Sequence, residues 1–209
     1  MTGGSLICSS NPAVERTCAK CRAGRSLLRY AAQTQPSMYS IRCTRKLLNR
    51  GAPPLVQSPT APTTVLGDWY ANIIFSRPEQ LVICISQKTL LPVVVPAKDI
   101  KRLPERVLAA AEIMLTAIGV PSEEVASELD EMQKAVFAKT EDRRVLGSLN
   151  DFVFHLQHGT GSHPHMTLHE RALCIARMPC GALEYAYPTE ATLAAFSASR
   201  TLKAAMRAA

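Results

Sequence analysis

Residues 138–156, AKTEDRRVLGSLNDFVFHL, are the stretch from which we predict the organisation of the domain. Apolar residues recur in it every three or four positions, which is the spacing of a buried helical stripe. They are Val145, Leu146, Leu149, Phe152, Val153 and Leu156. The densest group of polar side chains in the chain alternates with them. We therefore predict a helix here that packs an apolar face on a core and carries the chemically active residues beside it.

The composition is that of a globular protein. Of the 209 residues, 47% are hydrophobic and 20% are charged, which excludes both a disordered chain and a membrane protein. The longest apolar runs are too short to span a bilayer, so we expect no membrane segment. Seven cysteines, an odd number without regular spacing, do not describe a disulfide framework. Because a secretory signal is also absent, we expect a cytoplasmic location.

The net charge of +7 is concentrated at one end of the chain. Residues 1–37 hold five basic residues and one acidic residue, whereas residues 38–209 hold 19 and 16. The domain therefore lacks the concentrated basic stripe of a nucleic-acid-binding surface. A nucleic-acid partner would bind mainly through the basic N-terminal segment.

Residues 1–37 are rich in small, polar and basic residues and have no sustained periodicity. We expect a disordered basic extension, or a start codon assigned too far upstream. Cys18 and Cys21 form a CxxC pair with metal-ligand spacing, but no second pair completes a zinc site and no thioredoxin-like unit surrounds it. We favour cysteines without a function here over a metal or redox site.

Four segments after this point carry the alternation or β-branched content of strands: residues 39–43, 69–75, 81–86 and 90–95. Short turns join the last three, which predicts an antiparallel meander. Pro92 cannot donate to a strand ladder, so we place the last strand at an edge or at a bulge. The Pro/Ser/Thr-rich residues 52–64 form a loop that is long enough to act as a flap.

The rest of the chain has helical periodicity. Pro104 suits the first turn of one helix and Gly119 its end; Ser122 is expected to cap the next, whose apolar stripe runs to Val136. Thr167 and Glu170 form a capping box for a later helix, and a last helix is expected from Thr189. We predict an α+β fold with a small antiparallel sheet of three to four strands, followed by four to five helices packed on one face. Residues 38–188 would form the domain, and residues 189–209 a C-terminal helix and tail.

All five histidines fall in residues 155–169. They are His155, His158, His163, His165 and His169. Such a density would be able to ligate zinc, nickel or copper. However, Gly159, Gly161 and Pro164 indicate a loop, and no preorganised pair of ligands is present. We favour a solvated linker, and we assign no metal and no cofactor.

Several blocks of the sequence resemble one bacterial family of uncharacterised domains, a domain of unknown function. The blocks are MYSIRCTRKLL at 38–48, LGDWYAN at 66–72, TLLPVVVPA at 89–97, AKTEDRRVLGSLNDF at 138–152 and MPCGALEYAYP at 178–188. Members of that family typically begin where Met38 stands, so the resemblance implies that residues 1–37 are an extension or a misplaced start. It implies no activity, and it marks the histidine loop as an insertion between blocks.

Polar residues in these blocks form our candidate ligand site. They are Lys46, Asp68, Trp69, Asn72, Thr140, Arg144, Ser148, Asn150 and Asp151. If they converge on one cleft, they would suit an anionic small molecule or a protein partner, because Arg and Lys donors beside Ser, Thr and Asn suit an anion such as a phosphate or nucleotide. The main interpretation is thus a small ligand- or protein-binding, regulatory module. Purely structural roles are the alternative: Asp142 or Thr140 as a helix cap, Arg144 in an ion pair with the preceding helix and Asn150 bonded to backbone.

An enzyme is the second hypothesis. Asp68 and Asp151 would serve as paired acid and base or hold a divalent metal, while Lys46 or Arg144 stabilises negative charge during hydrolysis of a phosphorylated or nucleic-acid substrate. No nucleophile motif or phosphate-cradling glycine loop supports this, so we assign no catalytic residue. The hypothesis requires the two carboxylates to approach one reacting atom.

Overall fold

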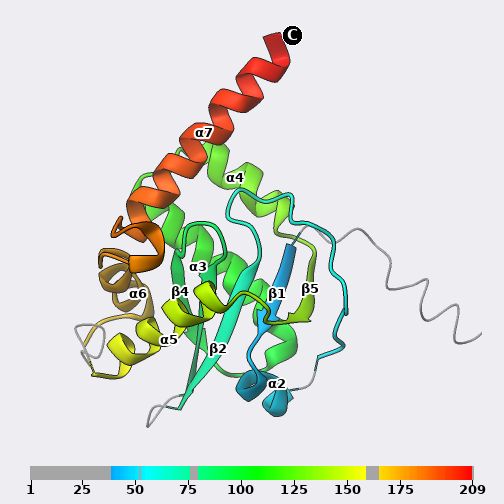
Figure 1. The fold of residues 1–209 in the computed structure, drawn as a ribbon, viewed down its shortest axis with the longest axis vertical. Helices are drawn as coiled ribbons and strands as arrows, with labels where there is room; N and C mark the ends of the chain where they lie inside the picture. The colour runs from blue at the N-terminus through cyan, green and yellow to red at the C-terminus, as the bar shows by residue number, and fades with distance from the viewer. Residues whose placement is uncertain (1–38, 52, 76–79, 159–164, 209) are drawn as a thin grey trace, which may run out of the picture. The chain divides into compact units, whose positions relative to one another are not determined.

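The structure is a computed structural model, and it describes residues 39–51, 53–75, 80–158 and 165–208. Five strands and six α-helices lie in this part of the chain (Figure 1). The strands are β1 (Tyr39–Cys43), β2 (Trp69–Phe75), β3 (Gln80–Ser86), β4 (Pro92–Pro96) and β5 (Ala135–Lys139). The helices are α2 (Arg45–Gly51), α3 (Leu103–Ile118), α4 (Ser122–Glu131), α5 (Arg143–His158), α6 (Leu168–Ala176) and α7 (Pro188–Ala208), with short 3-10 turns η1 (Ile100–Arg102) and η3 (Gly181–Leu183).

The strands form one mixed sheet in the order β4-β3-β2-β1-β5. Strands β2, β3 and β4 make the predicted antiparallel meander, and Pro92 begins β4 at an edge of the sheet, as predicted. Strand β1 instead pairs in parallel with β2 on one side and with β5 on the other. The α+β class is confirmed, but the sheet has five strands and is mixed, where we predicted three to four antiparallel strands.

Strand β5 is the element that the sequence analysis missed. We predicted a helix whose apolar stripe continues to Val136, whereas α4 ends at Glu131 and Val136 lies in β5. The strand pairs with β1 from Tyr39↔Ala135 to Cys43↔Lys139. The spacing from Met132 to Val136 fits a helix equally well, and periodicity alone does not distinguish a short buried strand from a helical turn.

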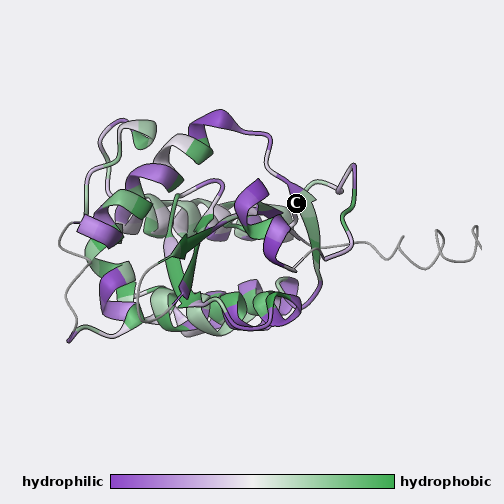
Figure 2. Ribbon diagram, turned by 90° about the horizontal axis from the view of Figure 1, so that it is seen from below, coloured by the Kyte–Doolittle hydropathy of each residue, from purple (hydrophilic) through white to green (hydrophobic). Residues whose placement is uncertain are grey.

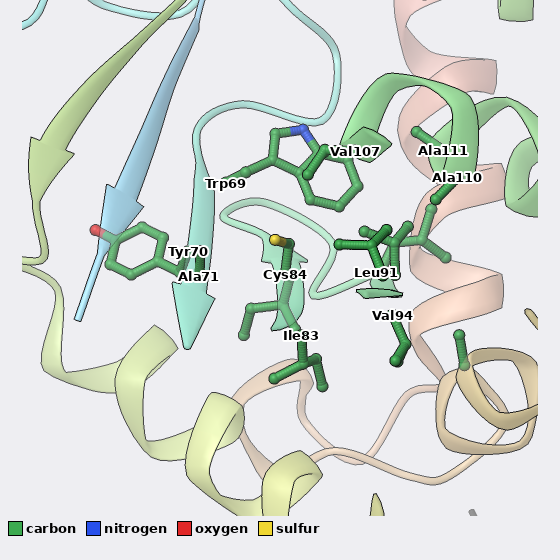
Figure 3. Close-up of a cluster of buried hydrophobic side chains, with 14 of the residues drawn as sticks. Trp69, Tyr70, Ala71, Ile83, Cys84, Leu91, Val94, Val107, Ala110 and Ala111 are labelled. Carbon is green, nitrogen blue, oxygen red and sulfur yellow. The ribbon is translucent and has the colours of Figure 1, made fainter. Parts of the chain in front are cut away.

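Helices cover both faces of the sheet, not one face as predicted (Figure 2). Trp69 and Cys84 lie beside Val107, Ala110 and Ala111 of α3, and Tyr70 points away from that helix (Figure 3). The hydroxyl of Tyr70 accepts a bond from the backbone of Asp142, directly before α5, so α5 lies on the opposite face. Helix α6 contacts β4 and also contacts both α3 and α5. Because helices cover both faces of the sheet, all five residues of β1 are buried, including the polar Ser40 and Arg42.

The predicted helix ends are mostly confirmed. Gly119 ends α3 with a left-handed backbone, at a φ of 90°, which glycine adopts without strain. Thr167 and Glu170 form the predicted capping box of α6. The prediction for Ser122 was wrong, because Pro121 occupies the N-cap position of α4 and no side chain caps this helix. Proline at this boundary fixes the entry of the chain in place of a side-chain hydrogen bond.

The loop before β2 is attached to the body of the domain at two points. Leu55 forms a parallel bridge with Phe137, and the amide of Val56 donates to the Phe137 carbonyl at 2.8 Å. Further on, the carboxylate of Glu128 in α4 accepts the amides of Val65 and Leu66 at 2.8 and 2.9 Å. These bonds hold both ends of the loop that we considered as a flap.

No helix among those described is both long enough and apolar enough to cross a membrane. The predictions for Cys18, Cys21 and the rest of residues 1–37 lie outside the described residues, as does His163.

Candidate functional site

Arg42 is the centre of a buried polar region of the described domain. It lies near the carboxyl end of β1, beside the carboxyl end of the parallel strand β5. Its side chain is only 8% exposed, and its Nε donates to Oδ2 of Asp68 at 2.7 Å. Its Nη1 contacts Oε1 of Glu141 at 2.6 Å and the carbonyl oxygen of Lys139 at 3.4 Å. The carboxyl ends of adjacent parallel strands are where open α/β sheets commonly bind ligands.

The guanidinium stays charged in this place. Burial by itself lowers the pKa of Arg42, but the hydrogen bond and charge of Asp68 raise it, and Tyr70 and Glu141 add to that effect. The net direction is upward. Asp68 is 1% exposed, and its other oxygen, Oδ1, accepts the backbone amide of Ser40 at 2.8 Å. Asp68 therefore holds Arg42 from inside the domain and does not face a ligand.

A small pocket of about 70 Å³ opens at the outer side of Arg42. It is lined by Arg42, Leu55, Val56, Gln57, Ala138, Lys139, Thr140 and Glu141. Sites for whole small molecules usually measure ~300–1,000 Å³. The space therefore suits one charged group of a larger ligand, and we call it the Arg42 pocket.

Two further hydrogen bonds organise the polar face of the sheet near this pocket. Thr44 Oγ1 donates to Oδ1 of Asn72 at 2.8 Å, which joins the end of β1 to β2. The amide of Asp142 donates to the hydroxyl of Tyr70 at 3.3 Å. Burial is the main cause that raises the pKa of Tyr70, so this hydroxyl stays protonated at neutral pH. The bonds fix the segments that follow β1 and β5 relative to β2.

The structure brings some of the predicted site residues together. Asp68 contacts Arg42, Thr140 lines the Arg42 pocket, and Asn72 is bonded to Thr44 next to it. Lys46 is exposed on α2. Trp69 belongs to the core on the α3 side of the sheet, with no exposed surface. Trp69 was therefore a wrong choice: its alternation along β2 turns it away from the polar face.

The predicted residues of α5 form a separate group. Arg144 Nη1 donates to the Ala182 carbonyl at 3.1 Å. The thiol of Cys180 donates a hydrogen bond to Oγ of Ser148 at 3.5 Å. Asp151 is exposed and lines another pocket, of about 190 Å³, with His155 and Cys180. Asn150 is exposed. The single cleft that we expected is thus divided into two places.

One of the structural alternatives is confirmed, the cap at Asp142, and the alternative given for Arg144 is not. The Oδ1 of Asp142 accepts the amides of Arg144 and Val145 at 2.8 and 3.4 Å, so Asp142 caps α5. Arg144 bonds to the backbone of η3 and has no ion pair with α4 among the described contacts. The paired acid and base of the enzyme hypothesis are not formed, because Asp68 is buried on Arg42 while Asp151 lines a different pocket at the surface.

Histidine, cysteine and carboxylate side chains do not gather into a metal site in the part of the chain that the structure describes. No three of them are placed to hold one ion there. His155 and His158 flank the ring of Phe154 on the last turns of α5. Four cysteines, Cys43, Cys84, Cys174 and Cys180, are free thiols.

Sequence reasoning missed Arg42 and Glu141. Arg42 stands on the polar side of an alternating strand, and α5 and the segment before it cover that side in the structure. One signal was present: an arginine inside a short apolar strand needs a buried acidic partner, and Asp68 is the acidic residue directly before the next strand.

Comparison with known proteins places the chain in a family. The profile of one family, described as a Domain of unknown function (DUF6933), matches residues 40–191. No curated protein and no solved structure matches the chain. The matched region runs from β1 into the first turn of α7 and includes both groups of polar residues described above. The chain therefore belongs to the family of the Domain of unknown function DUF6933.

Proposed function

We propose that this domain is a binding module that receives one anionic group, a carboxylate or a phosphate, of a small molecule or protein partner in the Arg42 pocket. The observation that carries the proposal is the asymmetry of the two partners of Arg42. Asp68 is 1% exposed, whereas the side chain of Glu141 is 68% exposed. The inner carboxylate fixes the guanidinium, and the outer carboxylate occupies the place that an incoming anion would take.

Exchange of Glu141 for a ligand is energetically inexpensive. Glu141 is the exposed partner of a buried guanidinium, and a carboxylate that water already solvates adds only ~1 kcal/mol to such a pair. The charge of Arg42 is fixed by the fold and costs nothing further to desolvate when the ligand binds. A guanidinium also offers its donors in a plane that matches two oxygens of a carboxylate or phosphate.

The surroundings of the pocket favour an oxyanion over a neutral group. Lys139 and Thr140 at the end of β5 add a cation and a hydroxyl, and Gln57 adds an amide from the attached loop. The small volume admits a head group and leaves the remainder of the ligand outside. As part of the proposal we place the protein in a reducing compartment such as the cytoplasm, which the four free thiols support.

Isothermal titration calorimetry with inorganic phosphate and with acetate tests the proposal. Glu141→Ala is expected to tighten binding up to about fivefold, because the competing carboxylate is worth at most ~1 kcal/mol. Arg42→Lys is expected to abolish binding, since an ammonium group lacks the planar pair of donors.

The matched control is Glu105→Ala. Glu105 is a glutamate exposed to a similar degree, 65% against 68% for Glu141, and it pairs with the exposed Arg102 at 2.9 Å at the start of α3. Its loss should leave anion binding unchanged. The proposal fails if the wild-type chain and the Glu141→Ala variant bind phosphate and acetate equally, or if neither anion binds at millimolar concentration.

A further inference from the structure

A second, larger cavity lies between α4 and α7, and we call it the α4–α7 groove. It measures about 380 Å³, within the range of sites that hold a whole small molecule. It is lined by Val65, Glu123, Glu124, Ser127, Glu128, Phe196, Ser199, Arg200, Lys203 and Ala204. None of these residues lines the Arg42 pocket, so the groove is a separate place on the domain.

The two walls of the groove carry opposite charges. Helix α4 contributes the carboxylates, and helix α7, which runs past it in Figure 1, contributes Arg200 and Lys203. Arg200 Nη1 pairs with Oε1 of Glu124 at 2.8 Å, and this pair holds the walls together. Lys203 Nζ makes only a long contact of 3.4 Å with the hydroxyl of Ser127. Its ammonium charge is therefore not matched by a carboxylate in the described contacts.

Glu124 has an unused acceptor. Its second oxygen, Oε2, is buried and has no hydrogen-bond partner in the described structure. A buried acceptor without a donor costs ~1–3 kcal/mol, and more when the group is charged. A ligand that donates a hydrogen bond to this atom would remove that cost. The best donor for a carboxylate oxygen is a cationic N–H group.

Glu128 is not available for the same purpose. It is 2% exposed, and its two oxygens accept the amides of Val65 and Leu66. Burial, the largest cause, raises the pKa of Glu128, while those two bonds oppose the rise. Its role is to fix the base of the groove, where Val65 and the buried ring of Phe196 provide apolar surface.

From this arrangement we propose that the α4–α7 groove binds a small zwitterion, with an ammonium group on Glu124 Oε2, a short hydrocarbon chain against Phe196 and a carboxylate toward Lys203. The net charge of the walls excludes a dianion, because three carboxylates face two cations. The ligand class is thus an amino acid whose two charged groups are separated by a few methylene groups.

Three related probes separate the parts of this proposal. They are 5-aminopentanoate, which carries both charges, pentylamine, which carries only the ammonium, and pentanoate, which carries only the carboxylate. Calorimetric titration of the full chain is expected to show the tightest binding for 5-aminopentanoate. Glu124→Gln should weaken it at least tenfold, the equivalent of one charge-assisted hydrogen bond. Lys203→Met should weaken 5-aminopentanoate but leave pentylamine unchanged.

Glu112→Gln on α3 is the matched control, because Glu112 is an exposed helical glutamate outside the groove. Circular dichroism checks that each variant is folded. The proposal is overturned if 5-aminopentanoate does not bind at millimolar concentration, or if its affinity is the same in the Glu124→Gln variant. Binding of 5-aminopentanoate that is lost in Arg42→Lys and kept in Glu124→Gln would assign its carboxylate to the Arg42 pocket and would also overturn it.

Discussion

Strands β1 and β2 present two faces of different chemistry, although alternate residues of the same segments build both. The face toward α3 carries Tyr39, Ile41, Cys43, Trp69 and Ala71, while the face toward α5 carries Ser40, Arg42, Tyr70 and Asn72, with Asp68 at its start. Both faces are buried. Depth of burial therefore does not distinguish the core from the candidate site in this domain. The distinguishing feature is the charge of Arg42, which is buried together with its partner Asp68.

The first way to test this contrast is to remove the largest side chain of the apolar face. Trp69→Ala is expected to lower the free energy of unfolding by about 4 kcal/mol, because it leaves a cavity in a packed core. Urea denaturation followed by circular dichroism measures the change. Phe75→Ala is the control in the same strand: Phe75 is 59% exposed and should cost less than about 1 kcal/mol. Equal losses in the two variants would contradict a sealed face beside α3.

Asp68, directly before Trp69 in the chain, tests the polar face. Asp68→Ala removes the buried partner of Arg42 and the acceptor of the Ser40 amide. We expect a loss of about 3 kcal/mol, because an uncompensated buried charge is costly and only the exposed Glu141 remains to balance it. The same denaturation experiment applies, with Asn150→Ala on the exposed side of α5 as a neutral control. A loss below about 1 kcal/mol would mean that Arg42 reaches water without Asp68.

The smallest effect comes from a pair of tyrosines, one on each face. Tyr70→Phe removes the acceptor of the Asp142 amide and should cost about 1 kcal/mol. The hydroxyl of Tyr39 is buried and has no partner among the residues that the structure describes, so Tyr39→Phe should be neutral or stabilising. Thermal denaturation of both variants measures the difference. A larger loss of stability in Tyr39→Phe than in Tyr70→Phe would show that the hydroxyl of Tyr39 has a hydrogen-bond partner in solution.

Alkaline titration sharpens the result for Tyr39. Burial raises the pKa of Tyr39 above its ordinary value of 10.0, and it also raises the pKa of Cys43 to about 12. Since these groups ionise more readily in the unfolded chain, their contribution to stability is complete below the unfolded values and is lost as the pH rises above them. The free energy of unfolding should fall above about pH 9–10, and less steeply in Tyr39→Phe than in the wild type.

Local signals in the sequence predicted much of the fold. The meander, the end of α3 at Gly119, the capping box of Thr167 and the edge position of Pro92 all follow from residues close together in the chain. What local signals did not reveal are pairings over long separations. Strand β5 forms against β1, about a hundred residues earlier, and its Val136 continues the apolar period of the preceding helix.

The candidate site shows the same division. Asp68, Asn72 and Thr140 were predicted because a polar residue beside an apolar run is a signal that the local sequence carries. Arg42 was not, because its burial depends on α5 and its neutralisation depends on Asp68, neither of which periodicity in β1 reveals. Trp69 was chosen together with Asp68 and Asn72 of the same segment, but alternate residues of a strand point to opposite faces, so Trp69 lies on the apolar face.

The bridge between Leu55 and Phe137 determines how a partner chain can approach this sheet. An unpaired edge strand invites another strand to add by main-chain hydrogen bonds, which leads to peptide capture or to aggregation. Here the outer side of β5 is occupied by residues 55–56, while β4 has prolines at both ends and α6 packed against it. Both edges of the sheet are therefore protected against strand addition, and the partner that we propose would be recognised through side chains at the pockets.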